Sequence, residues 1–276
     1  LNDVATAGIT LATLEADANV ILTAAGNTAI TNDAALALQG AVTGTLAATA
    51  STGGITDSSN LSATGNVTLN DVASAGITLD TLEADANVII TAAGNTAITN
   101  DAALALQGTV TGTLDATATT GDITDSDALA VSGASVFTLG ADGTNITLDS
   151  AANAFSGAVT LKAGSSGSQT FGNITFVDSG AIDFAGSASS DGDLFLDGGP
   201  DNTVGGTLAV TATTGGITDS ATIAVTGDLT LNDVATAGST LDTLEADANV
   251  ILTAAGNTAI TNDAALALQG AVTGTL

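Results

Sequence analysis

Short stretches in which apolar and polar residues alternate run through the whole chain, with turn residues between them. In the segment 46–69, for example, Leu46, Ile55 and Leu61 are flanked by Thr, Ser or Ala, and Gly, Asn and Asp occupy the breaks. Such period-two alternation predicts short β-strands. The segment 33–40 also fits a single helical turn, but its two leucines lie two residues apart. Helix caps and a 3.6-residue period are missing throughout the sequence.

Whole segments of the chain recur at two different shifts. Residues 1–46 return at 69–114 with four changes and at 231–276 with two changes. Segments that repeat in this way are typical of proteins built from stacked units. We therefore expect 68-residue units, at 1–68 and 69–136, inside a longer repeat that restarts at residue 231.

An Ile-Thr pair marks a shorter interval. Its first spacings are 25, 22, 21, 25 and 23 residues, which divides a 68-residue unit into three coils of about 22–23 residues with about three short strands each. A coil of this size buries its apolar face only by stacking on its neighbours. The pattern predicts an all-β fold, one continuous β-solenoid over residues 1–276, with about twelve coils stacked about 4.8 Å apart.

The alternation also predicts which side chains point inward. The expected core positions are Val20, Leu22, Ile30, Leu36 and Leu38, with their equivalents Leu46, Ile55, Leu61, Val67 and Leu69. The stretch 134–206 departs from the regular pattern, because it contains all six Phe residues, Lys162 and Pro200. Two interpretations are open: the Phe side chains fill longer, wider coils, or the stretch forms a loop that contacts a neighbour or a ligand.

The acidic composition limits the possible partners. Asp and Glu number 29 against a single basic residue, Lys162, which gives a formal net charge of −28. Nucleic acids and anionic lipids both bind through basic residues, so neither is an expected partner. The hydrophobic fraction of 45% argues against disorder. No apolar run reaches the roughly 18 residues of a membrane-spanning helix, so membrane insertion is not expected.

Aspartates accompany the Ile-Thr pairs. If the coils stack in register, these carboxylates form a column at one corner, where neighbours repel unless they are exposed to solvent, cap turns or share Ca²⁺. The candidate column consists of Asp33, Asp57, Asp80, Asp101, Asp125, Asp149, Asp219, Asp242 and Asp263. Turn caps and weak Ca²⁺ binding both remain open, and no cofactor is required. A titration with Ca²⁺ and EDTA that follows the melting temperature distinguishes the two.

The residue types present argue against an enzyme. Without His or Cys, the chain has no imidazole base, no thiolate and no zinc site of the usual kinds. Asp191, Asp193 and Asp197 form a local cluster, and paired carboxylates are the groups that a glycosidase needs. However, the chain lacks Tyr and Trp platforms for sugars, and Asp in a turn-rich segment is usually a solvated turn residue. We therefore expect no catalytic residues.

Rows of Thr suggest an alternative binding function. A flat hydroxyl array could bind ice or carbohydrate, although Thr is also a common outward residue of strands. The candidate rows are Thr117, Thr119 and Thr120, echoed by Thr211, Thr213 and Thr214.

Three coil-like segments carry a family resemblance. Gly-Asn-Val-Thr-Leu at 65–69, Gly-Asp-Ile-Thr at 121–124 and Gly-Asn-Ile-Thr-Phe at 172–176 resemble segments of filamentous-haemagglutinin-like proteins. The Cys-free composition and the long duplications resemble those of giant repetitive bacterial surface adhesins. The resemblance covers nearly the whole chain. It implies a right-handed parallel β-helix, an extracellular location at the cell surface, and a role in adhesion, biofilm or fibres, with no catalytic residues.

The two ends of the sequence show no capping pattern. The chain begins without Met or a basic leader and stops within a repeat, so we expect an internal piece of a longer protein. Open ends of a solenoid are sheet edges that pair with similar strands. We therefore expect copies of the chain itself as partners, end to end or side by side, and other cells or surfaces as further candidate partners.

Overall fold

The computed structural model describes residues 1–163, 170–187, 189–197 and 203–276. Within these ranges every regular element is a β-strand, and the pairings are parallel, as expected. Pro200 lies outside the described residues. The described part of the chain contains no helix long and apolar enough to span a membrane.

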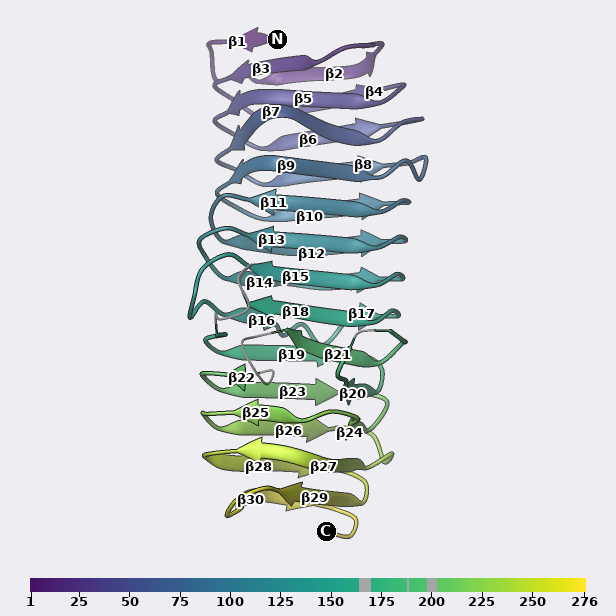
Figure 1. Cartoon of the computed structure of the whole chain (residues 1–276). Coiled ribbons are helices and arrows are strands. Elements are labelled where there is room, and N and C mark those ends of the chain that lie inside the picture. The colour runs from purple at the N-terminus through teal and green to yellow at the C-terminus, as the bar shows by residue number, and fades with distance from the viewer. Residues whose placement is uncertain (164–169, 188, 198–202) are drawn as a thin grey trace.

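The strands form two parallel sheets, here called sheet A and sheet B, on either side of a narrow core (Figure 1). Sheet A contains β1 (Asn2–Asp3), β3 (Val20–Ala24), β5 (Leu36–Val42), β7 (Ile55–Ala63), β9 (Ile77–Ala84), β11 (Thr96–Asn100), β13 (Leu114–Ala118), β15 (Ser135–Leu139), β18 (Val159–Ala163), β20 (Ile182–Phe184), β21 (Asp193–Asp197), β22 (Thr203–Val204), β24 (Ile217–Asp219), β25 (Ile223–Val225), β27 (Ser239–Ala246) and β29 (Thr258–Asn262). Sheet B contains β2 (Ile9–Leu14), β4 (Thr28–Asn32), β6 (Leu46–Ala50), β8 (Val67–Asp71), β10 (Val88–Ala92), β12 (Leu104–Val110), β14 (Ile123–Val131), β16 (Ile146–Leu148), β17 (Ala154–Phe155), β19 (Ile174–Asp178), β23 (Leu208–Ala212), β26 (Leu229–Asp233), β28 (Asn249–Ala254) and β30 (Ala267–Val272).

Consecutive strands alternate between the two sheets from β1 to β16, so that one full turn contributes to both sheets, whereas β16–β17, β20–β22 and β24–β25 are consecutive strands of one sheet. The prediction of about three strands per coil holds for some turns, such as the one that contains β23, β24 and β25, but the regular turns near the N-terminus contain only two strands each. In sheet B, thirteen of the 14 strands pair one after another in a single order along the rod. The chain makes about one turn between each strand and the next, so these thirteen strands correspond to twelve turns. Figure 1 shows a right-handed rod with the termini at opposite ends. The expected right-handed β-solenoid of about twelve coils is confirmed.

Turn length varies along the rod. In sheet B, Thr28 pairs with Leu46 and Leu46 with Val67, so the regular turns near the N-terminus are short and similar in length. In the Phe-containing stretch, Ile174 pairs with Leu208, so the turn between them is much longer. The expected length of about 22–23 residues per coil is therefore an average of short regular turns and long irregular ones.

The 68-residue repeat contains three and a half turns, whereas the Ile-Thr spacing predicted three. Seven strands, β4 to β10, separate one copy from the next, so the segment Thr-Ala-Ile-Thr-Asn lies in sheet B as β4 and in sheet A as β11. The interval from Ile30 to Ile55 spans β4, β5, β6 and the start of β7, which is one and a half turns. The prediction failed because β5 and β6 contain no Ile-Thr pair. Copies that are one 68-residue unit apart consequently face opposite sides of the rod, whereas the third copy, in β29, lies in sheet A like β11.

Apolar side chains fill the space between the sheets. All ten predicted core positions are buried, with at most 6% exposure. Among the six Phe residues, five lie in the core, and Phe195 is half-buried on the outward side of β21. Phe155 stacks on Phe176 with ring centroids 5.3 Å apart and meets Phe137 edge-on at 5.9 Å. The interpretation that Phe fills wider coils is thus confirmed for these five.

Polar side chains tie successive coils together at the corners. The buried Asn100 accepts a hydrogen bond from the Ala84 N–H at 2.8 Å and donates through Nδ2 to the Ala84 carbonyl at 3.1 Å. Asn32 makes the same contacts with Ala16. These contacts satisfy backbone groups at a corner where the strand register shifts, so the core stays free of unpaired amides there.

Candidate functional site

The nine aspartates expected in one column are divided between the two sheets. Asp33, Asp125 and Asp149 lie in or just after strands of sheet B, and Asp57, Asp80, Asp101, Asp219, Asp242 and Asp263 in or just after strands of sheet A. The single column was a wrong prediction, because the 68-residue unit turns the chain by a half-integral number of coils. What remains are two groups of three neighbours in sheet A, one pair in sheet B, and Asp33 by itself.

Within these groups, the first carboxylate caps the next coil. Asp57 accepts hydrogen bonds from the backbone N–H groups of Asp80 at 3.0 Å and Thr81 at 2.6 Å. Asp219 does the same for Asp242 and Thr243, at 2.7 and 2.8 Å. Asp125 likewise accepts from the N–H groups of Asp149 and Ser150. These contacts support the interpretation of the aspartates as caps.

A shallow groove of about 260 Å³ lies over one such group, beside Asp80, Glu83 and Asp101. Among the described residues, no three acidic side chains are arranged so that they could hold a metal ion. Calcium binding at the nine aspartates therefore stays a prediction.

The cluster Asp191, Asp193 and Asp197 is organised as a turn. Asp193 accepts hydrogen bonds from the N–H groups of Ser189 at 2.9 Å and Ser190 at 2.7 Å. These hydrogen bonds hold the pKa of the Asp193 carboxyl below its ordinary value, and the bond from the Ser189 N–H has the largest effect. Asp197 forms an ion pair with Lys162 at 3.5 Å. The general acid of a glycosidase requires the opposite shift, a raised pKa.

The Thr rows contribute hydroxyl groups to the contacts between coils. The Thr119 Oγ1 donates to the Asn100 carbonyl at 2.9 Å and the Thr120 Oγ1 to the Asp101 carbonyl at 3.0 Å. Thr213 and Thr214 both donate to the Ser179 carbonyl in the preceding coil. Because four of the six candidate hydroxyls bond the backbone in this way, the rows stabilise a corner of the rod.

One structural motif escaped the prediction from sequence. The segment Asn-Asp-Val-Ala-Thr/Ser-Ala-Gly occurs at 2–8, 70–76 and 232–238. The buried Asp71 accepts a hydrogen bond from the Gly76 N–H at 2.9 Å, and Asp3 accepts one from the Gly8 N–H at 2.8 Å. The threefold recurrence of Asp five residues before Gly was the available signal. The motif closes a corner loop with an aspartate carboxylate.

Buried carboxylates predict a stability that rises on mild acidification. Burial raises the pKa of Asp178 above its ordinary value of 3.8, although hydrogen bonds from the backbone of Phe155, Gly180 and Ser179 act to lower this pKa. Burial likewise raises the pKa of Asp233. For each of these carboxyls, the folded state binds more protons than the unfolded state at pH values between its unfolded pKa and its higher folded pKa. Its extra stability is complete below the unfolded pKa and is lost as the pH rises through the folded pKa. The urea midpoint should therefore increase as the pH falls from 7 toward about 4.

The substitution Asp178→Asn tests the origin of this pH dependence. It should flatten the curve of urea midpoint against pH, whereas Asp115→Asn, on the exposed side of β13, should leave the curve unchanged. Identical pH dependence in wild type and Asp178→Asn would contradict the assignment.

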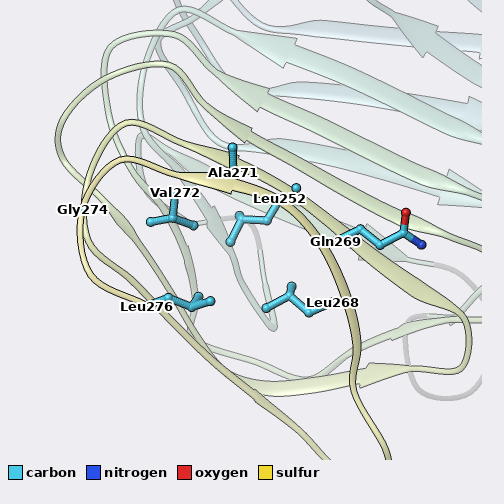
Figure 2. Close-up of a pocket in the computed structure, with 8 residues that line it drawn as sticks. Leu252, Leu268, Gln269, Ala271, Val272, Gly274 and Leu276 are labelled. Atoms are coloured by element: carbon cyan, nitrogen blue, oxygen red, sulfur yellow. The ribbon is translucent and has the colours of Figure 1, made fainter.

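The C-terminal end of the rod contains an open apolar groove of about 310 Å³ (Figure 2). Figure 2 shows Leu268, Val272 and Leu276 pointing into the space enclosed by the last coil, while Gln269 points away from it. The backbone of β30 is paired with β28 on one edge only. Apolar side chains and an open strand edge thus lie together at this end of the rod.

Comparison with protein families gives two matches. A family described as repeats of unknown function (DUF5649) matches residues 25–92 and 93–162, which together make up half of the chain. The chain belongs to this family. Comparisons with curated proteins and with solved structures find no match.

The DUF5649 matches coincide with the structural repeat. The first DUF5649 unit contains β4 to β10, and the second contains β11 to β17 and most of β18. Each DUF5649 unit thus adds about three and a half turns and transfers the chain to the opposite sheet. The capping aspartates Asp57 and Asp125 occupy the same position in successive DUF5649 units and lie on opposite faces.

Proposed function

We propose that the chain is a structural segment of an extracellular filament or a giant cell-surface adhesin, in which it acts as a stalk or fibre body. The observation that carries this proposal is the pair of parallel sheets that extends along the whole rod, which each repeat lengthens by further turns. Stacked backbone hydrogen bonds provide length and stiffness, and the capping side chains join neighbouring coils.

The high negative net charge supports a role as a rod whose surface is exposed to water. A net charge of −28 keeps neighbouring rods apart and retains cations and water at the surface. The resemblance to bacterial adhesins supports a proposed location at the cell surface. We propose no catalytic role, since among the candidate carboxylates Asp193 accepts hydrogen bonds within a turn and Asp197 forms an ion pair with Lys162.

Insertion of one more repeat tests the mechanical part of the proposal. A duplicate of residues 25–92 placed after residue 92 should lengthen the rod by about 17 Å, from three and a half turns of about 4.8 Å, at constant cross-section. Small-angle X-ray scattering measures both dimensions. A wider cross-section with unchanged length would contradict the proposal.

Accessibility on the source cells tests the location. Antibodies raised against the purified chain should label intact cells, and added protease should remove the label. Labelling that requires cell lysis would contradict the extracellular assignment and leave the mechanical part unaffected.

A further inference from the structure

One side of the rod carries almost no charge, although the chain as a whole has a net charge of −28. We propose that this side, the outer face of sheet B, is where two copies of the chain pack against each other, side by side and in opposite directions. The inference adds lateral pairing to the proposed structural role. It rests on strand faces along the side of the rod and needs no free chain end.

Acidic residues are distributed unequally between the two sheets. The strands of sheet A contain eleven acidic residues, from Asp3 in β1 to Glu245 in β27. The strands of sheet B contain five, of which Asp71, Asp178 and Asp233 are buried in the core. Within the described strands, the outer face of sheet B thus carries acidic side chains only in β14. A second acidic rod therefore meets the least repulsion on this face.

Two patches with the same central residues lie on this face. Patch 1 consists of the outward residues of β8, β10 and β12, and patch 2 of those of β26, β28 and β30. In each patch an outward Ile pairs with Thr on one neighbouring strand and with Gln on the other. These central residues are Thr68, Ile89 and Gln107 in patch 1, and Thr230, Ile251 and Gln269 in patch 2. The same outward surface is thus presented twice on one side of the rod.

Both patches combine apolar side chains with free hydroxyl groups. Val72 and Val234, which directly follow β8 and β26, are 56% and 54% exposed. The hydroxyl groups of Thr91 and Thr253 make no hydrogen bond within the described part of the chain, unlike that of Thr119 at a corner. Small outward side chains allow two such faces to approach to about 10 Å, the spacing of stacked sheets. The patches therefore offer apolar contact and hydrogen bonds to a face of the same kind.

The positions of the patches define how the second copy is placed. β10 and β28 are seven strands apart in sheet B, which corresponds to about 34 Å at about 4.8 Å per strand. We consider a two-fold axis parallel to the strands, midway between β16 and β19. This axis places β10 opposite β28 of the second copy, so that Ile89 meets Ile251. The symmetry repeats the contact, and each patch is matched once.

The acidic residues near β14 favour opposite directions over the same direction. If both copies ran in the same direction, β14 would face β14 and Asp127 would lie near its own counterpart. In opposite directions, β14 faces β23, whose outward residues Ala209 and Thr211 are uncharged. Asp149, directly after β16, then faces β19, where the acidic residue Asp178 is buried. The antiparallel arrangement thus keeps the acidic groups of the two copies apart.

The area of the face is sufficient for a stable pair. From β8 to β30, sheet B contains ten strands in order, and at about 4.8 Å per strand and about 16 Å of strand length they cover about 800 Å². Two copies then bury about 1,600 Å², the size of a typical specific interface. On the other sides of the rod, the acidic residues of sheet A and of the corners keep neighbours apart. The expected product is therefore a pair and not a larger bundle.

Sedimentation equilibrium of the purified 276-residue chain tests the proposal. The wild type should form dimers, and small-angle X-ray scattering should show the length of one rod with a larger cross-section. Ile89→Asp should weaken dimerisation roughly tenfold or more, since it places a charge in two apolar contacts of each dimer. Ile21→Asp is the matched control, because Ile21 occupies the same repeat position but is 54% exposed on sheet A, in β3. Circular dichroism verifies that both variants fold.

A paired substitution tests the direction of the second copy. Ile89→Asp combined with Ile251→Lys places opposite charges in contact if the copies run in opposite directions, and like charges if they run in the same direction. The double variant should therefore dimerise more tightly than Ile89→Asp alone. A double variant that associates no better than Ile89→Asp would overturn the antiparallel arrangement.

Three further outcomes would overturn the proposal as a whole. They are a wild type that stays monomeric up to its solubility limit, a dimer with the length of two rods, and equal weakening by Ile21→Asp and Ile89→Asp. None of them affects the stalk function, which depends on the lengthening of the rod by an inserted repeat.

Discussion

Replacement of Gly108 by alanine is expected to lower the free energy of unfolding by about 3 kcal/mol or more. Gly108 has φ of +118°, in a region that L side chains rarely adopt. A Cβ atom at this position would collide with the carbonyl oxygen of Ile90 in β10. Neither strand can move away, because both are paired on their other edges. Urea denaturation followed by circular dichroism measures the loss.

Gly143→Ala is the matched control for this prediction. Gly143 also has a positive φ, +70°, but a Cβ there meets no atom within 4 Å. Only the backbone penalty applies, so the expected loss is about 1–2 kcal/mol. Equal losses for the two variants would show that the close approach to Ile90 contributes nothing.

Replacement of Phe176 by alanine is expected to cost about 3–5 kcal/mol. Phe176 is 2% exposed and stacks on Phe155 in the core, so its removal leaves a cavity there. Phe195→Ala removes the same side chain from the half-buried outer side of β21 and should cost about 1 kcal/mol or less. Thermal unfolding of the two variants distinguishes them. A similar melting temperature for both would contradict the assignment of Phe176 to the core.

The inward positions could be predicted because they depend on the strand period alone. Each strand alternates between the core and solvent, so Leu36 and Leu38, or Val67 and Leu69, share a face whatever the number of strands in a turn. The number of strands in a turn depends instead on where the chain bends. Two corners beside β6 show this: Thr-Gly precedes the strand and Ser-Thr-Gly-Gly follows it. Both sequences indicate a break between strands, but neither shows whether the chain bends slightly there or reverses its direction.

The caps could be predicted in kind but not in partner. Asp57 follows an Ile-Thr pair and precedes Ser, which indicates a turn residue. Its actual donors, the N–H groups of Asp80 and Thr81, lie in the next coil. Identification of these donors requires the turn length between the two positions. That length differs from coil to coil, as the short turn between β4 and β6 and the long turn between β19 and β23 show.

The half-integral repeat has a consequence for how such proteins change in length. Unequal recombination between the similar 68-residue copies would add or remove one unit and preserve the strand register, so the product should still fold. Each such event nevertheless rotates everything beyond it by half a turn about the rod axis. A domain attached at the far end would face one side in variants with an odd number of units and the opposite side in variants with an even number. The number of repeats therefore determines both the length of the rod and the side toward which an attached domain faces.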